Sequence, residues 1–157
     1  MVLSGPFAMP TRDKQPGLLV DTSVAVALVV GDHEHHLATL TAIGDRRLGL
    51  AGHAVFETFS VLTRLPPPAR RPPDVVATLL AQNFPDSVFL SPERAALLID
   101  VLGRAGIAGG SVYDALVGAT AVEHGLKLAT RDQRALVTYR ALGVDLEFLA
   151  DRAVDPI

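Results

Sequence analysis

The chain has 157 residues, 49% of them apolar and 20% charged, with 14 basic against 17 acidic side chains and a formal net charge of −3. These figures predict one globular domain and exclude disordered, collagen-like and disulfide-stapled classes, since the chain has no cysteine. The longest aliphatic run, residues 24–30, is far shorter than the roughly 20 residues of a bilayer span. We therefore do not expect the chain to be a membrane protein.

Strands and helices are expected to alternate along the chain. Short apolar runs bounded by turn residues predict strands at 18–20, 47–51, 88–90, 126–130 and 144–149. Apolar residues at helical spacing predict helices at 24–30, 32–44, 53–65, 74–84, 91–103, 111–122 and 132–142. This alternation with short joints favours an α/β fold, in which a parallel sheet is covered on both faces.

Particular residues are expected to begin the helices and to join them. Asp32, Ser91 and Ser111 are predicted caps, and Pro92 follows Ser91 in the first helical position. Residues 65–73 read LPPPARRPP and predict an extended, solvated connector with polyproline character. We expect a flexible tail at 1–17, a single domain at 18–150 and a C-terminal tail at 151–157, without internal repeats.

Four acids occupy positions where open α/β sheets hold functional residues. Asp21 directly follows the first predicted strand, and Asp132 closely follows the strand that ends near Thr130. The carboxyl ends of parallel strands share one edge of a sheet, so both acids are expected on the same rim. Glu57 and Asp114 fall in the opening turns of two helices. Each acid is embedded in apolar sequence, and a buried carboxylate requires a cation or hydrogen-bond donors.

Each acid also has a structural interpretation. Asp114, three residues after Ser111, fits a variant of the capping box, and Asp132 suits the positive end of a helix. Glu57 alone is most simply a solvated helix residue. Asp21 is harder to explain structurally, because an acid at a buried strand end followed by two hydroxyl residues is a common site-forming turn. Their joint placement favours a functional site.

The chain resembles the PIN-domain family, and most closely the VapC-type ribonuclease toxins of bacterial toxin–antitoxin pairs, from Leu18 to about Leu149. The matching segments are LLVDTSV at 18–24, HAVFETFSVLTRL around Glu57, VYDALVGATAVEHGLKLATRD at 112–132 and the closing VDLEFL. The third segment is the most specific, because an aspartate opening a small-residue helix is followed by glycine, a strand and T-x-D. The resemblance implies a three-layer α/β/α sandwich around a central, mostly parallel sheet.

The resemblance also implies an endoribonuclease that depends on Mg²⁺ or Mn²⁺. The family's acids map onto Asp21 and Asp114 as direct ligands, with Glu57 and Asp132 as direct or water-mediated partners. Hard ions of this kind prefer oxygen ligands and bind through one or two carboxylates plus substrate phosphate. The expected orienting residues around these acids are Thr22, Ser23 and Thr130. The expected partners are substrate RNA and a cognate antitoxin, in a homodimer or a toxin–antitoxin hetero-oligomer, in the cytoplasm, although the sequence leaves secretion open.

Basic charge comes almost entirely from arginine, whose planar fork suits phosphate. The candidates for lining an RNA path are Arg64, Arg70, Arg71, Arg131 and Arg134. The histidines of GDHEHH and His53 are interpreted as helix-start residues rather than metal ligands. A net charge of −3 argues against binding nucleic acid, but one bound Mg²⁺ changes it to −1 and two change it to +1. We therefore expect RNA engagement to depend on metal.

Two other functions remain open at this point. The first is a non-catalytic PIN scaffold that binds RNA or a protein partner, and on which metal would have no effect. The second is a phosphohydrolase of the haloacid-dehalogenase type, which also has an aspartate after its first strand. That chemistry needs a second acid two residues later, where this chain has Ser23.

Overall fold

The computed structural model describes residues 17–151, so nearly all of the two predicted tails, 1–16 and 152–157, lies outside the described residues. Four strands form one sheet in the order β2-β1-β3-β4, and every pair of neighbours is parallel. The strands are β1 (Leu18–Val20), β2 (Leu48–Leu50), β3 (Leu128–Thr130) and β4 (Leu146–Phe148). The predicted parallel sheet is confirmed.

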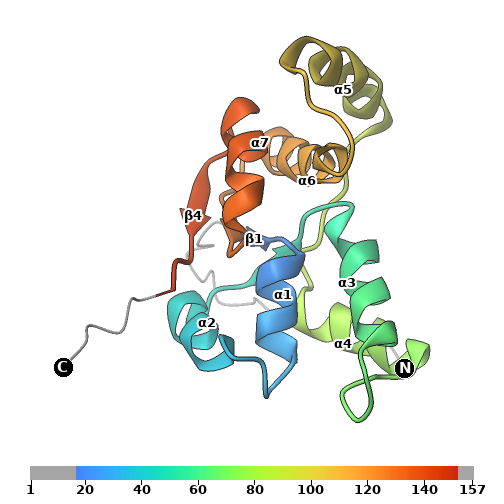
Figure 1. The fold of residues 1–157 in the computed structure, drawn as a ribbon, viewed down its shortest axis with the longest axis vertical. Helices are drawn as coiled ribbons and strands as arrows, with labels where there is room; N and C mark the ends of the chain where they lie inside the picture. The colour runs from blue at the N-terminus through green and yellow to red at the C-terminus, as the bar shows by residue number, and fades with distance from the viewer. Residues whose placement is uncertain (1–16, 152–157) are drawn as a thin grey trace, which may run out of the picture.

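Seven α-helices and one short 3₁₀ turn connect and cover the strands within the described range. They are α1 (Thr22–Val29), α2 (His36–Ile43), α3 (Ala54–Arg64), α4 (Pro73–Asn83), α5 (Pro92–Ala105), α6 (Ser111–His124), η1 (Gln133–Ala135) and α7 (Leu136–Ala141). Figure 1 shows α1 to α4 gathered in one half of the molecule and α6 and α7 in the other, with α5 projecting beyond α6. The predicted α/β fold with helices around a central sheet is confirmed. None of these helices is long and apolar enough to cross a membrane.

The core is built on the sheet because β1, β2 and β3 are buried along their whole length. Burial of both sheet faces explains why these strands are rich in apolar residues and show no alternation of apolar and polar residues. Close approach of the backbone requires glycine at position 49, where a Cβ would clash with the Asp86 carbonyl oxygen. A smaller apolar cluster joins Leu98 and Leu102 of α5 to Ala115 of α6. The projecting helix α5 therefore packs on α6 through a cluster of its own.

Several predicted helix starts are wrong in detail. Asp32 does not cap the second helix, because the intervening residues form turns and α2 begins only at His36. Ser111 is the first residue of α6 rather than its cap. The cap position is occupied by Gly110, which has no side chain to accept a hydrogen bond. The predicted helix at 132–142 is divided into η1 and α7. The cap at Ser91 is confirmed, since its hydroxyl accepts a hydrogen bond from the Arg94 amide.

Two predicted extended segments are also different. The 88–90 segment contributes a single parallel bridge between Val88 and Ala51 rather than a strand. The proline-rich connector contains a turn closed by a hydrogen bond from the Ala69 amide to the Pro66 carbonyl. It then returns to α3, where the Arg71 amide donates to the Leu62 carbonyl at 3.3 Å. Prolines lack an amide but keep their carbonyl acceptors, so they do not prevent such a turn.

Candidate functional site

Asp21 lies at the carboxyl end of β1 and is also the N-cap residue of α1. Its Oδ1 accepts hydrogen bonds from the Ser23 hydroxyl at 2.5 Å and the Val24 amide at 3.3 Å. Its Oδ2 accepts a hydrogen bond from the Tyr139 hydroxyl at 2.9 Å. Burial raises the pKa of Asp21, and these donors oppose the rise by favouring the carboxylate. The fold therefore fixes the direction of both carboxylate oxygens.

The ends of β1 and β3 are joined by hydroxyl groups. Ser23 accepts a hydrogen bond from the Arg131 amide at 2.8 Å while it donates to Asp21, so one hydroxyl links the two strand ends. Thr130 lies 3.5 Å from the Ser23 hydroxyl and accepts from the Asp132 amide at 3.0 Å. Both residues lie where the sequence placed them, beside the acids.

Thr22 lies elsewhere. Its hydroxyl is 3.5 Å from the Ala54 carbonyl and accepts a hydrogen bond from the Thr58 hydroxyl at 3.2 Å. These contacts tie α1 to α3, and Thr22 makes no hydrogen bond to an acid within the described part of the chain. The predicted contact between Thr22 and a carboxylate is not among these bonds, because the first turn of α1 directs the side chain toward α3. That Thr22 orients a bound water stays a prediction.

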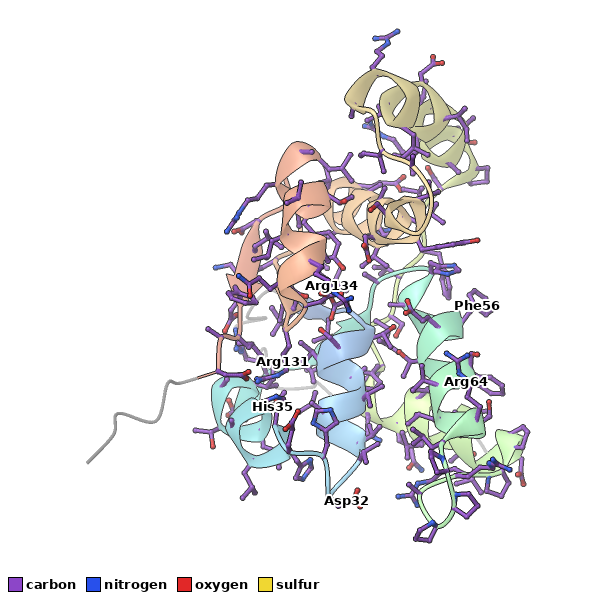
Figure 2. All side chains as sticks on the ribbon, in the orientation of Figure 1. Asp32, His35, Phe56, Arg64, Arg131 and Arg134 are labelled. Carbon is purple, nitrogen blue, oxygen red and sulfur yellow. The ribbon has the colours of Figure 1, made fainter. Side chains whose placement is uncertain are left out.

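Asp132 ends the segment that follows β3 and caps η1. Its Oδ1 accepts a hydrogen bond from the Arg134 amide at 2.9 Å, and the Arg134 Nε lies 3.7 Å from the same oxygen. The Arg134 side chain is 96% exposed, so solvent screens this ion pair. Figure 2 shows Arg134 beside the N-terminal end of α1, the end that Asp21 caps.

Asp114 is half-buried in the first turn of α6. Its pKa is raised to about 6, first by burial and then by the neighbouring charges of Asp132, Asp21 and Glu57, while Arg134 opposes the rise. Glu57 is exposed in the first turn of α3. The other three acids therefore lie close enough to Asp114 for their charges to raise its pKa.

The donor set fits a hard divalent ion bound through few protein ligands. The four side chains offer carboxylate oxygens only, and their mutual repulsion at Asp114 is the kind that a bound cation offsets. Within residues 17–151, no three acidic or histidine side chains approach closely enough to hold one ion together. An ion of the magnesium type usually needs only one or two carboxylates, with water and substrate oxygens completing the shell. Asp21 and Asp114 are the residues that would hold it.

The five predicted RNA-path arginines do not form one group. Arg134 lies at the acids, whereas Arg64 lies in the last turn of α3, two turns and about 10 Å along the axis from Glu57. Arg70 donates from Nε to the Leu65 carbonyl at 2.9 Å, in the connector that also holds Arg71.

Arg131 points away from the acids although it precedes Asp132. Its side chain is only 8% exposed and bonds to the Asp151 carboxylate and to the Thr39 hydroxyl of α2. Figure 2 shows it next to His35, whose Nδ1 lies 3.1 Å from the same carboxylate. Arg131 therefore connects β3 to α2 and is not placed to line a path for RNA.

Tyr139 of α7 is the site residue that the sequence did not reveal. Burial and the adjacent Asp21 carboxylate raise the pKa of Tyr139, so its hydroxyl stays protonated and donates. Gly118 of α6 makes room for the ring, since a Cβ there would lie 3.1 Å from Tyr139 Cδ1. A tyrosine within an apolar helix is a signal that its hydroxyl has a buried partner, but the sequence does not identify that partner.

Comparisons with known proteins agree with this architecture. The family model described as PIN domain matches residues 18–141. Ribonuclease VapC27 of Mycobacterium tuberculosis is 47% identical over 130 residues, which cover 83% of this chain and 95% of that protein. Ribonuclease VapC40 of the same species is 45% identical over 131 residues, covering 82% and 96%.

The fold is also found in solved structures. The DNA-bound VapBC structure from Salmonella typhimurium superposes with a TM-score of 0.61 at 18% identity, covering 85% of this chain and 98% of that one. At this identity the likeness establishes the fold, whereas the family follows from the sequence matches. The chain belongs to the PIN-domain family and, within it, to the VapC type.

Proposed function

We propose that this protein is an endoribonuclease that depends on Mg²⁺ or Mn²⁺ and acts as the toxin of a VapBC-type toxin–antitoxin pair. The observation that carries the proposal is the gathering of Asp21, Glu57, Asp114 and Asp132 at the carboxyl rim of a parallel sheet. The names of the VapC27 and VapC40 relatives support ribonuclease activity. The Salmonella VapBC and Neisseria gonorrhoeae FitAcB neighbours support assembly with an antitoxin.

The acids have different tasks because their surroundings differ. Asp21 is held in place by three donors, so it provides a fixed ligand. Asp114 has a pKa of about 6, so near neutral pH most copies are ionised and available to a cation. Bound divalent metal supplies Lewis acidity, which lowers the pKa of water for attack on the phosphodiester and stabilises charge at phosphorus. Arg134 approaches Asp132 to 3.7 Å, which supports a role for its guanidinium in binding substrate phosphate beside the acids.

The test is cleavage of total RNA and of a short single-stranded RNA by the purified chain, with Mg²⁺, with Mn²⁺ and with EDTA. We expect products only with metal and none from Asp114→Asn at equal fold content. Cleavage of equal rate by Asp114→Asn would contradict the proposal. Binding of RNA without cleavage under any metal condition would favour a non-catalytic scaffold instead.

A further inference from the structure

Tyr113 and His53 form an aromatic pair next to the acids. The chain is poor in aromatic side chains, with six Phe, two Tyr and no Trp. Tyr113, in the first turn of α6, is 53% exposed, and its ring stacks on the His53 ring with a centroid distance of 4.8 Å and an interplanar angle of 22°. A half-exposed ring contributes little to a core, so its support by a second ring indicates a different role.

Each ring of the pair is a near neighbour of one carboxylate along its own helix. Asp114 directly follows Tyr113 on α6, while Glu57 is one turn beyond His53 on α3, with its amide donating to the His53 carbonyl at 3.1 Å. Asp114 and Glu57 also interact electrostatically. The stacked rings therefore bridge the N-terminal ends of the two helices that carry these acids, and any ligand on Tyr113 lies beside the acidic site.

An unpaired nucleic-acid base is the ligand that fits this surface. Every base has a flat face that stacks on an aromatic ring, and sequence-tolerant contacts of this kind hold single strands in many proteins. An apolar protein segment fits less well, because covering Tyr113 would remove water from the Asp114 and Glu57 carboxylates without supplying a cation. We propose that Tyr113, backed by His53, is a stacking platform for one unpaired base of single-stranded RNA at the acidic site.

This inference rests on the proposed ribonuclease function and adds a base-contacting residue to it. Bases in an A-form duplex are stacked on one another and cannot also lie flat on Tyr113. The platform therefore selects single-stranded segments, such as loops and ends, over duplex RNA. His53 acts by holding the Tyr113 ring in position.

The experiment compares Tyr113→Ala and Tyr113→Phe in binding a fluorescently labelled single-stranded RNA by anisotropy. Ca²⁺ replaces Mg²⁺ to offset the carboxylate charge, and RNA integrity is checked on a gel. Loss of one stacked base predicts a Kd about 5- to 150-fold higher for Tyr113→Ala, whereas Tyr113→Phe keeps the ring and the affinity. The matched control is Phe56→Ala, which removes a 64% exposed ring on the outer side of α3 that pairs with Phe89 (Figure 2).

Substituting an abasic nucleotide at successive RNA positions completes the test. At one RNA position, the abasic substitution should weaken binding to the wild type but should not change binding to Tyr113→Ala. The base and the Tyr113 ring form one contact, and either change removes it. Equal Kd values for wild type and Tyr113→Ala would overturn the platform. A change in the oligomeric mass of Tyr113→Ala by light scattering would also overturn it, by assigning the ring to a protein interface.

The two proposals fail separately. If the wild type cleaves RNA and Tyr113→Ala has the same KM and kcat, the platform falls and the ribonuclease function stands. If the wild type cleaves no RNA with any metal, the ribonuclease function falls, while binding in Ca²⁺ still decides whether Tyr113 contacts a base.

Discussion

The two sides of the acidic site are built in different ways. On the strand side, Asp21 is buried and both its carboxylate oxygens accept hydrogen bonds from Ser23, Val24 and Tyr139. On the helix side, Asp114 is half-buried and Glu57 exposed, and neither accepts a hydrogen bond from another described residue. The protein thus fixes the direction of the Asp21 carboxylate and leaves the Asp114 and Glu57 carboxylates without such support.

The difference is also electrostatic. Hydrogen bonds partly compensate for the burial of Asp21, whereas Asp114 is surrounded by three acids and only one opposing arginine, Arg134. A carboxylate whose charge is not offset by hydrogen bonds or by opposite charges is stabilised most by a bound cation. The strand side therefore holds a carboxylate in a fixed direction, and the helix side carries the charge that a bound cation would offset.

The largest expected effect is loss of cleavage in Asp21→Asn and in Asp114→Asn. Removal of a metal ligand should reduce the rate at least about 100-fold, more than loss of a residue that only orients a ligand. Asp114→Asn should also raise the Tm of the metal-free protein, because it removes a repelled charge. RNA cleavage assays and thermal melting measure both effects, with the exposed Asp100→Asn of α5 as control. Equal loss of activity in the control would point to a general charge effect.

Metal should stabilise the folded chain through the helix side. At a metal concentration 100 times the Kd, binding to the native state alone adds about 2.7 kcal/mol to the free energy of unfolding. Thermal melting with increasing Mn²⁺ should show this gain in the wild type, its loss with EDTA, and a much smaller gain in Asp114→Asn. A Tm independent of metal up to millimolar concentration would show that the carboxylates do not bind it.

Tyr139→Phe should leave the Asp21 carboxylate in place but remove one of the hydrogen bonds that hold it. Its hydroxyl is one of three donors to Asp21, and loss of a partner that orients a ligand typically reduces metal affinity or activity about 10- to 100-fold. The metal Kd should rise, while the Asp114 and Glu57 carboxylates of the helix side are unaffected. Tyr113→Phe removes the other described tyrosine hydroxyl and serves as control for metal affinity. An unchanged metal Kd in Tyr139→Phe would show that Ser23 and Val24 suffice.

The smallest effect concerns pH. Because the folded-state pKa of Asp114 is raised from 3.8 to about 6, the folded chain binds more protons than the unfolded chain in this window. The metal-free free energy of unfolding should therefore fall as pH rises from 4 to 6, by on the order of 1 kcal/mol from this group after allowing for solvent screening. Urea unfolding at several pH values measures it. Asp114→Asn should flatten the slope, and saturating metal should reverse the loss.

Much of the site was predictable because its determinants are local. Buried strands read as apolar runs, and parallel strands bring their carboxyl ends to one edge. Asp21 follows such a run directly and Asp132 follows one after a single residue, so predicting their position on the rim needed no knowledge of distant contacts. Ser23 and Thr130 lie within two residues of those acids and were predictable for the same reason.

Other features were settled by groups far apart in the chain. The Tyr139 hydroxyl reaches Asp21 across 118 positions, and it does so because Gly118 leaves space for the ring. Arg131 turns to Asp151 and Thr39 although its neighbour Asp132 belongs to the site. Thr22 bonds to α3 although it follows Asp21.

The sequence by itself determined the α/β class, the parallel sheet and the four acids, because these depend on short-range patterns and on the common direction of the strands. Tertiary structure alone decided which carboxylate is held by the protein and which stays free, which arginine faces the acids, and that Tyr113 stacks on His53. These features depend on the side-chain contacts that form when α1, α3, α6 and α7 pack around the sheet. Such contacts join residues far apart in the chain, so no local sequence pattern predicts them.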